Sequence, residues 1–443
     1  MIVTKLRQFL ASCRFPLIGP RARSGGICLA AVAGLLAAGL LASATHAADK
    51  PQLTVSHDKA GWQANFEAYG KDDPTASWQV TPFGDTTNYQ AAVRAALPTT
   101  SAPGMFTWWS GYRMKDLVEA GLLEDLTAIW KPLLAEGKVK QEVADAFSFD
   151  GKIYAVPNNV AYWAMFYNKN VYKELGLEVP RTWEELEGNL AKIKAANKIP
   201  IGQTIEGRWP AFIWFSEFLV RSDPDFYVKL MAGKAKYTDP QVAAAFATWK
   251  DWMAKGWMDD GTSPFGFTTG DSMNNSFAQG KVVHMLVGTW FADTVTKAGT
   301  IEGRDWGLFV LPNRNASLPP SVIFEAGPLL VSKNSDTHET AVKAAAHWMS
   351  KEGEQRWADL TGFLVANSDA KLPDDKEVAK LNDAVVKGNY KLLGRYWETT
   401  PSPIAEAAVD EISKFVLDPN SAPEVMQNLQ KIADDYWAAH PKP

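Results

Sequence analysis

Short apolar runs alternate with amphipathic segments over the first part of the chain. Three runs have the period of strands and two segments between them have the spacing of helices: strands at 53–56, 78–81 and 105–108, and helices at 60–69 and 89–97. This order is typical of an α/β domain with a largely parallel sheet. Ligands of such sheets lie beyond the carboxyl ends of the strands. We therefore expect residues 57–62 and 108–112 to lie at one rim.

The alternation continues to residue 331, and helices are expected to dominate from 338 onward. Thr182 followed by Glu185 predicts a capped helix start, and Pro240 predicts a second helix start. Further strands are predicted at 151–157, 282–287, 308–311 and 327–331. Because no flexible linker interrupts the pattern, we expect two lobes with the chain passing between them more than once.

Residues 1–47 have the pattern of a secretory signal peptide. They contain five basic residues and no acidic one, an apolar run from Ile27 to Leu41, and small residues at Thr45 and Ala47. The run is too short and too rich in glycine for a comfortable membrane span. We expect Sec-type export to the periplasm with cleavage after Ala47. No lipid anchor is expected, because no cysteine stands at the cleavage point.

Composition and charge argue against several functions. Removing the five cations of residues 1–47 takes the formal charge from −5 to −10, which disfavours nucleic acid and anionic lipid as partners. Both cysteines, Cys13 and Cys28, precede the predicted cleavage point, so no thiolate chemistry or Cys-ligated zinc is expected. Catalytic motifs are absent from the sequence, and the adjacent acids at 259–260 and 374–375 are interpreted as solvated loops. We expect no catalytic residue, metal site or cofactor.

Tryptophan is the unusual component, because all 18 follow residue 47. Many must pack in the core, where large aromatic side chains dominate burial. Others stand beside polar or glycine residues in predicted loops: Trp62 after Asp58, Trp108–Trp109, Asn158–Asn159 before Trp163, Glu206 before Trp209, and Gly288–Thr289–Trp290. Aromatic plates bury the C–H face of a pyranose at roughly 25 cal/mol per Å², and planar polar groups bind its hydroxyls. This combination favours a sugar site, with core packing as the alternative for each single tryptophan.

Four stretches, in this order, resemble the family 1 extracellular solute-binding proteins of ABC sugar transporters, the maltose-binding-protein-like group. The stretches are 106–111 with 117–126, then 151–158 with 166–176 and 180–186, then 277–285 with 288–290, and last 325–334. The second is the most specific, since it joins Gly-Lys-Ile-Tyr-Ala-Val-Pro-Asn to Phe-Tyr-Asn-Lys-Asn and Pro-Arg-Thr-Trp-Glu-Glu-Leu.

The resemblance implies a two-lobed periplasmic binding protein fold of the α/β class, with lobes joined by crossing hinge strands and a ligand cleft between them. Such proteins close around their ligand by hinge bending. Hinges are expected near Pro157–Asn158 and near Pro312. The expected division is lobe 1 at 48–157 and 318–361, and lobe 2 at 158–317 and 362–443. The implied function is a monomer that binds a neutral sugar or oligosaccharide and delivers it to the permease subunits of an ABC importer.

Positions that match the family imply sugar contacts from Asp58 and Trp109 in the first lobe, and make Trp290 the main stacking residue. The full set of expected ligand-binding residues is Asp58, Trp62, Trp108, Trp109, Asn159, Glu206, Trp209, Trp290, Glu325 and Trp397. Gly104 stands where many members have Asp, and Val160 where some maltose binders have an acid. These departures leave the identity of the sugar open.

Two other classes of function remain. A secreted carbohydrate-active enzyme, either a glycosidase or a lyase, would need a pair of buried carboxylates with a raised pKa. A binder of charged solutes would need clustered tyrosines for iron or an acidic cage for a polyamine, and neither stands out in the sequence.

Overall fold

A computed structural model describes residues 50–264 and 272–440. The predicted signal peptide therefore lies outside the described residues. The strands are β1 Gln52–His57, β2 Ser77–Pro82, β3 Met105–Thr107, β4 Ser148–Phe149, β5 Lys152–Ile153, β6 Ala155–Asn168, β7 Ile199–Gly202, β8 Val282–Gly288, β9 Trp306–Phe309, β10 Ser321–Val331 and β11 Lys391–Gly394. The first three confirm the strands predicted for that region to within about one residue.

Helices occupy most of the remaining chain. They are α1 Gln63–Asp72, α2 Thr86–Ala96, α3 Tyr112–Glu119, α4 Thr127–Ala135, α5 Gln141–Asp145, α6 Lys169–Leu175, α7 Trp183–Ala195, α8 Phe212–Ser222, α9 Pro224–Met231, α10 Pro240–Ala254, α11 Met273–Ala278, α12 Ala292–Lys297, α13 His338–Trp348, α14 Lys351–Thr361, α15 Glu377–Lys387, α16 Tyr396–Thr399, α17 Ser402–Leu417 and α18 Ala422–Ala439. Single 3-10 turns are η1 Ala60–Trp62, η2 Trp209–Ala211, η3 Thr289–Phe291 and η4 Pro419–Ser421. After residue 338 only β11 interrupts the predicted run of helices.

The predicted start of α7 shows how local chemistry sets an element. The Thr182 hydroxyl accepts the backbone N–H of Glu185 at 3.2 Å, and the Glu185 carboxylate reaches back to the N–H of Arg181 at 2.6 Å. The first bond pairs an N–H group that a helix start leaves without a partner, and the second ties the residue before the N-cap to the first turn, much as in a capping box.

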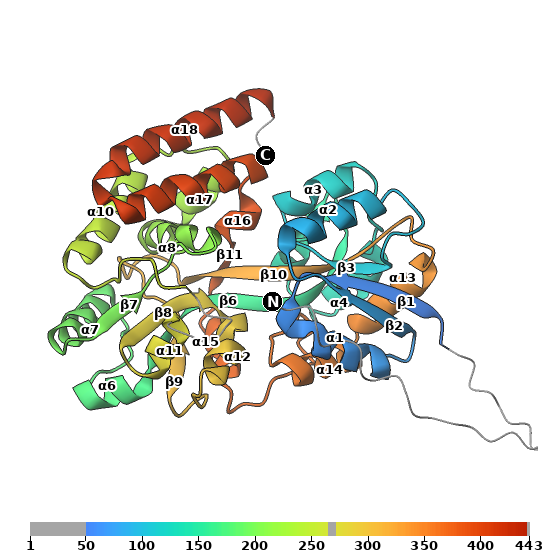
Figure 1. The fold of residues 1–443 in the computed structure, drawn as a ribbon, viewed down its shortest axis with the longest axis horizontal. Coiled ribbons are helices and arrows are strands. Elements are labelled where there is room, and N and C mark those ends of the chain that lie inside the picture. The colour runs from blue at the N-terminus through green and yellow to red at the C-terminus, as the bar shows by residue number, and fades with distance from the viewer. Residues whose placement is uncertain (1–49, 265–271, 441–443) are drawn as a thin grey trace, which may run out of the picture. The chain divides into compact units, whose positions relative to one another are not determined.

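The main sheet has the order β2-β1-β3-β10-β6-β8-β7, with β11 beside β10 and β9 beside β6. β1 pairs in parallel with β2 and β3, as predicted. The prediction of a largely parallel sheet is wrong at the centre, where β10 runs antiparallel to both β3 and β6. β6 and β10 are long because they pair with strands at both ends of the sheet. Figure 1 shows them running from one group of helices to the other.

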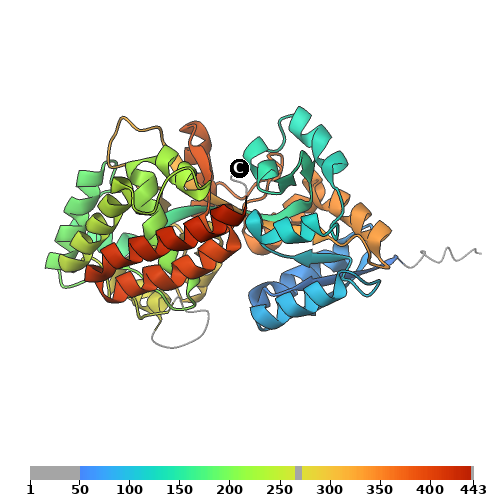
Figure 2. The ribbon, with the colours of Figure 1, turned by 90° about the horizontal axis from the view of Figure 1, so that it is seen from above.

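Two large apolar cores lie along this sheet. The first gathers β1–β3, α1, α13 and α14, and the second gathers α7, α8, α10 and α17. β6 contributes to both, since Tyr162 belongs to the first core and Trp163 to the second. The second core also contains side chains of α17 and α18, and the first contains side chains of α2 and α3. In Figure 2 the red helices α17 and α18 lie on one half of the molecule and the N-terminal blue helices lie on the other. The two cores define two lobes, while the residue limits of each lobe stay a prediction.

The crossing strands have an irregular ladder at their middle. Pro157 pairs with Pro328, the register shifts between Gly327 and Pro328, and neither proline has an N–H to donate. A tryptophan indole supplies a hydrogen bond where the ladder is irregular: the N–H of Trp348 donates to the carbonyl of Pro157 at 2.7 Å. The Pro157–Asn158 hinge prediction thus falls within a crossing strand.

Pro312 lies elsewhere. It belongs to the loop that precedes β10, and the neighbouring carbonyls of Leu311 and Ser321 accept hydrogen bonds from Arg221 at 2.8 and 3.0 Å. Because Arg221 is a buried residue of α8, this loop is tied to the second core. The prediction of a strand crossing at Pro312 is wrong, and β10 itself is the crossing segment.

Candidate functional site

The segments after β1 and β3 meet at one rim of the sheet, as predicted. The Asp58 carboxylate is 2% exposed, binds the Lys59 ammonium at 2.9 Å and accepts the Thr107 hydroxyl at 3.2 Å. The ammonium lies 4.8 Å from the centroid of the Trp109 ring, a cation–π distance. We call Asp58, Lys59, Trp108 and Trp109 the first rim. Since the Asp58 oxygens are already bonded within the protein, Trp109 and Lys59 are the groups that this rim presents.

A second group of aromatic rings comes from three segments far apart in the sequence. Phe212 at the start of α8 stacks on Trp397 with centroids 5.7 Å apart and ring planes inclined by 18°. Trp209 lies 6.4 Å from Phe212, and Trp290 lies 6.1 Å from Trp209. We call Trp209, Phe212, Trp290 and Trp397 the aromatic wall. Its three tryptophans are only half-buried, so their rings retain area that a ligand can cover.

Trp290 is held in place by the turn that follows β8. Its ring folds back over the strand, so that a Cβ added to Gly288 would lie 2.2 Å from the indole nitrogen. Only glycine leaves this room. The Thr289 hydroxyl accepts the backbone N–H of Tyr162 at 3.2 Å, which fixes the turn to the crossing strand β6. The orientation of Trp290 is therefore set by the sheet.

An ionic centre lies behind the aromatic wall. The Arg395 guanidinium forms ion pairs with both Glu325 of β10 and Glu398 of α16, and all three side chains are nearly buried. Burial raises the pKa of Glu325; the charge of Arg395 opposes this effect and the second carboxylate, Glu398, adds to it. The Arg395 guanidinium also lies 5.9 Å from the centroid of the Phe212 ring, a member of the wall. The centre therefore couples the wall to a crossing strand.

One side chain joins the first rim's helix to the aromatic wall. Arg113 of α3 places its guanidinium 3.8 Å from the centroid of Trp397 and binds Glu406 of α17 at 2.7 Å. Glu406 also forms an ion pair with Arg208 at 3.3 Å. Elements of both cores thus approach each other through Arg113.

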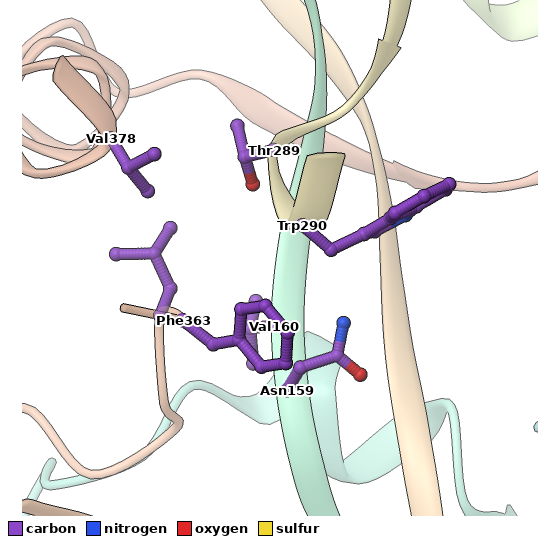
Figure 3. A pocket seen from close by; sticks show the side chains of 7 residues that line it. Asn159, Val160, Thr289, Trp290, Phe363 and Val378 are labelled. Carbon is purple, nitrogen blue, oxygen red and sulfur yellow. The ribbon is translucent and has the colours of Figure 1, made fainter. Parts of the chain in front are cut away.

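The remaining candidates lie near the crossing strands. Asn159, Thr289, Trp290 and Phe363 line a crevice that is too narrow to admit a water molecule. In Figure 3 the Trp290 ring points away from Phe363 and from the crevice. Trp62 packs against Phe363 with ring centroids 4.9 Å apart, so it is held in the packing beside the crevice.

The structure separates the ten predicted residues into groups. Trp209, Trp290, Glu325 and Trp397 come together at the wall and its ionic centre, and Asp58, Trp108 and Trp109 form the first rim with Lys59. Trp62 and Asn159 lie at the crevice. Glu206 is exposed in the loop before Trp209. The contact of these residues with a ligand stays a prediction.

Trp108 is buried and hydrogen-bonded within the protein. It is 3% exposed, and its indole N–H donates to the carbonyl of Arg113 at 2.9 Å. Its role is to fix the start of α3, which positions Arg113.

Sequence reasoning missed Arg113, Phe212, Arg395 and Glu406. A signal existed for Arg113, because it follows Trp109 by one helical turn at a predicted rim. For Arg395 the local signal was Glu398 three residues further on, whereas its second partner Glu325 is 70 residues away in the sequence and no local pattern links them.

The interpretation of residues 259–260 as a solvated loop is wrong for Asp259. Its carboxylate is half-buried and accepts the N–H groups of Gln203 and Gly261 at 3.0 and 3.2 Å. Burial raises the pKa of Asp259 to about 6. These bonds hold the end of β7, and Asp260 beside it is exposed, so the pair is structural.

Within residues 50–264 and 272–440, no cluster of three or more His, Cys, Asp or Glu side chains is arranged to hold a metal ion. The helices of that part of the chain are all too short or too polar to cross a membrane.

Comparison with known proteins places this geometry in context. A family model described as bacterial extracellular solute-binding protein matches residues 63–384, well over half of the chain. A probable sugar-binding periplasmic protein of Mesorhizobium japonicum is 25% identical over 424 residues, covering 89% of this chain and 96% of its own. An uncharacterized ABC transporter extracellular-binding protein of Pyrococcus horikoshii is 24% identical and covers 74% of this chain and 66% of its own.

Solved structures agree on the fold. A chitin oligosaccharide binding protein superimposes with a TM-score of 0.71 at 22% identity, covering 86% of this chain and 98% of its own. The bacterial solute receptor AcbH, described as having an exclusive preference for β-D-galactopyranose, superimposes with a TM-score of 0.74 at 21% identity, covering 88% of this chain and 99% of its own.

Proposed function

We propose, from the premise that the chain belongs to the bacterial extracellular solute-binding proteins of ABC transporters, that its solute is a neutral sugar or oligosaccharide. Membership in this family makes the protein a binding component that acts outside the cytoplasm, with permease subunits as partners, and not an enzyme. The names of its relatives, which include a probable sugar-binding periplasmic protein, support a sugar as the solute.

The observation that carries the proposal is the aromatic wall with its ionic centre. Half-buried rings of Trp290 and Trp397 offer plates for the apolar face of a pyranose, and such burial favours binding by roughly 25 cal/mol per Å². Arg395 and Glu325 supply planar donors and acceptors beside the rings. A sugar needs both, because its hydroxyl groups lose their water when the face is covered.

The ionic centre also argues against the glycosidase alternative. A glycosidase separates its two carboxyl groups so that one acts on each side of the scissile bond. Here Glu325 and Glu398 bind one guanidinium, and Arg395 occupies the space between them. The pKa of Glu325 is raised, as in an acid catalyst, yet the arrangement leaves no second carboxylate free to attack.

The proposal includes hinge closure. Lobe 1 comprises about residues 48–157 and 318–361, lobe 2 comprises 158–317 and 362–443, and closure brings the first rim towards the aromatic wall. Arg113, which already reaches Trp397, supports this because it joins the two sides without a covalent link. The protein acts as a monomer and is exported with removal of residues 1–47. N-terminal sequencing of periplasmic protein should begin near Ala48, and an intact Met1 in a membrane pellet would contradict the export step.

A ligand screen tests the function directly. Neutral mono- and oligosaccharides should raise the melting temperature, reduce the radius of gyration in small-angle scattering, and be recovered unchanged. Affinity should change little between low salt and roughly 0.5 M salt, at which exposed charges are screened. Release of sugar fragments in proportion to protein would refute the proposal, and a steep salt dependence would favour a charged solute.

A further inference from the structure

A groove beside the aromatic wall extends beyond the site described above. It has a volume of about 660 Å³ and lies between α2 and α3 on one side and α17 and α18 on the other. Its aromatic lining includes Trp109, Tyr112, Tyr436, Trp437 and His440. Figures 1 and 2 both place the C-terminal end of α18 beside α3. The volume falls within the range of about 300–1,000 Å³ that is usual for ligand pockets.

The charges in this groove cancel one another. Its acidic and basic residues form three pairs, each made within the groove: Arg94 with Asp116, Lys115 with Glu119 at 3.5 Å, and Arg113 with Glu406 at 2.7 Å. Because each of these cations already faces a carboxylate, the lining offers no net charge to a ligand. Paired ions still present donors and acceptors around their edges, which suits a neutral molecule rich in hydroxyl groups.

Aromatic faces line the groove on the α18 side. Tyr436 is half-buried and stacks on His440 with centroids 4.2 Å apart and ring planes inclined by 9°. Trp437 stands edge-on to Tyr436 at 4.9 Å and packs over Gly233, where a Cβ would lie 2.5 Å from the indole nitrogen. The end of α18 is thereby anchored to the second core, and Tyr436 is held as a fixed plate.

The groove is continuous with the proposed sugar site. Trp109 belongs to both the first rim and the groove lining, and Arg113 both lines the groove and covers Trp397 of the aromatic wall. The groove and the site thus share Trp109 and Arg113, and a linear ligand bound at the wall would reach the groove past Arg113.

We propose that this groove binds the distal rings of a neutral oligosaccharide, with Tyr436 as the stacking plate and Tyr112 and the paired ions as hydroxyl partners. This inference rests on the proposed function and deepens it: the solute is an oligosaccharide, and the C-terminal helix helps to select its length. The groove contributes binding only to rings beyond those at the aromatic wall.

Calorimetric titration with maltooligosaccharides, xylooligosaccharides and chitooligosaccharides of one to five rings tests this inference. In the series that binds, wild-type affinity should increase with ring number. Tyr436→Ala should leave the shortest bound sugar unaffected and weaken the longest by about tenfold, the loss expected of a moderate hot spot. Tyr436→Phe keeps the ring and should keep the affinity. Tyr390→Ala, a half-buried tyrosine outside the groove, is the matched control and should not alter the length dependence.

The outcomes separate the two proposals. If no series binds the wild-type protein, the sugar function itself fails and the groove proposal fails with it. If sugars bind but affinity is independent of length, or Tyr436→Ala weakens short and long sugars equally, the groove proposal is overturned while the function stands. A melting temperature and circular dichroism spectrum that match wild type establish that Tyr436→Ala is folded.

Discussion

Two groups of tryptophans in this molecule differ in burial and in the partners of their rings. Trp130, Trp348 and Trp357 belong to the first core, are fully buried, and each donates its indole N–H to a backbone carbonyl of the crossing strand β6. The tryptophans of the aromatic wall are half-buried and lie against one another, Phe212 and Arg113.

This difference teaches how to tell a structural tryptophan from a binding one. A buried indole whose N–H has a backbone partner is satisfied within the fold, because an unpaired buried polar group would cost free energy. A partly exposed ring beside ionic side chains still has surface that a ligand can contact. Removing the first kind should reduce folding stability, and removing the second kind should reduce affinity.

The largest effect is expected for Trp348→Ala, which should lower the free energy of unfolding by about 3–5 kcal/mol, because a buried ring leaves a cavity. Trp348→Phe is the graded control: it retains apolar volume but leaves the Pro157 carbonyl without its donor, for a loss of about 1–3 kcal/mol. Urea denaturation measures both. If Trp348→Ala were as stable as the wild type, the claim that the buried tryptophans stabilise the fold would be wrong.

Trp290→Ala should weaken sugar binding by about 2–4 kcal/mol, a hot-spot magnitude, while the melting temperature of the unliganded protein hardly moves. The physical reason is that a half-buried ring contributes little to packing and much to a stacked ligand. Titration calorimetry and thermal unfolding on the same sample give both values. Loss of stability with normal affinity would place Trp290 in the structural group.

An effect on the pH dependence of stability should come from Glu354, which lies in α14 with Trp357. Burial raises the pKa of Glu354 to about 8 from an ordinary value near 4.5. The folded protein therefore holds a proton that the unfolded chain releases, so this contribution is complete below about pH 4.5 and is lost as the pH rises towards 8.

Glu354→Gln should flatten this decline, since glutamine cannot ionise. Unfolding free energies measured between pH 5 and pH 8 give the slope, which should fall with pH in the wild type and less so in the variant. Neither the ionisation of Glu354 nor the substitution should alter sugar affinity, because Glu354 lies in the first lobe's interior and not at the wall. An identical slope in both proteins would mean that another group titrates.

Much of the fold followed from the sequence because its causes are local. The period of residues 53–56, the capping pair Thr182 and Glu185, and the proline at 240 act within a few residues of themselves. The motif resemblance was also sound, since the family match confirms it. The antiparallel centre of the sheet was missed because strand direction depends on how distant segments pair.

The candidate site divides in the same way. The sequence singled out Trp209, Trp290 and Trp397 from aromatic residues in polar surroundings, and with them Glu206, whose side chain is exposed in a loop and whose contact with a ligand stays a prediction. It overlooked Arg113, whose importance comes from Glu406, 293 residues further on.

By itself, then, the sequence determined many of the local elements and the family, because each depends on residue type and short spacing. Only the tertiary structure decided which tryptophans are buried, which charges pair, and that the end of α18 faces α3 across a groove. Burial and ion pairing depend on distances between segments far apart in the chain, and a linear pattern contains no such distances.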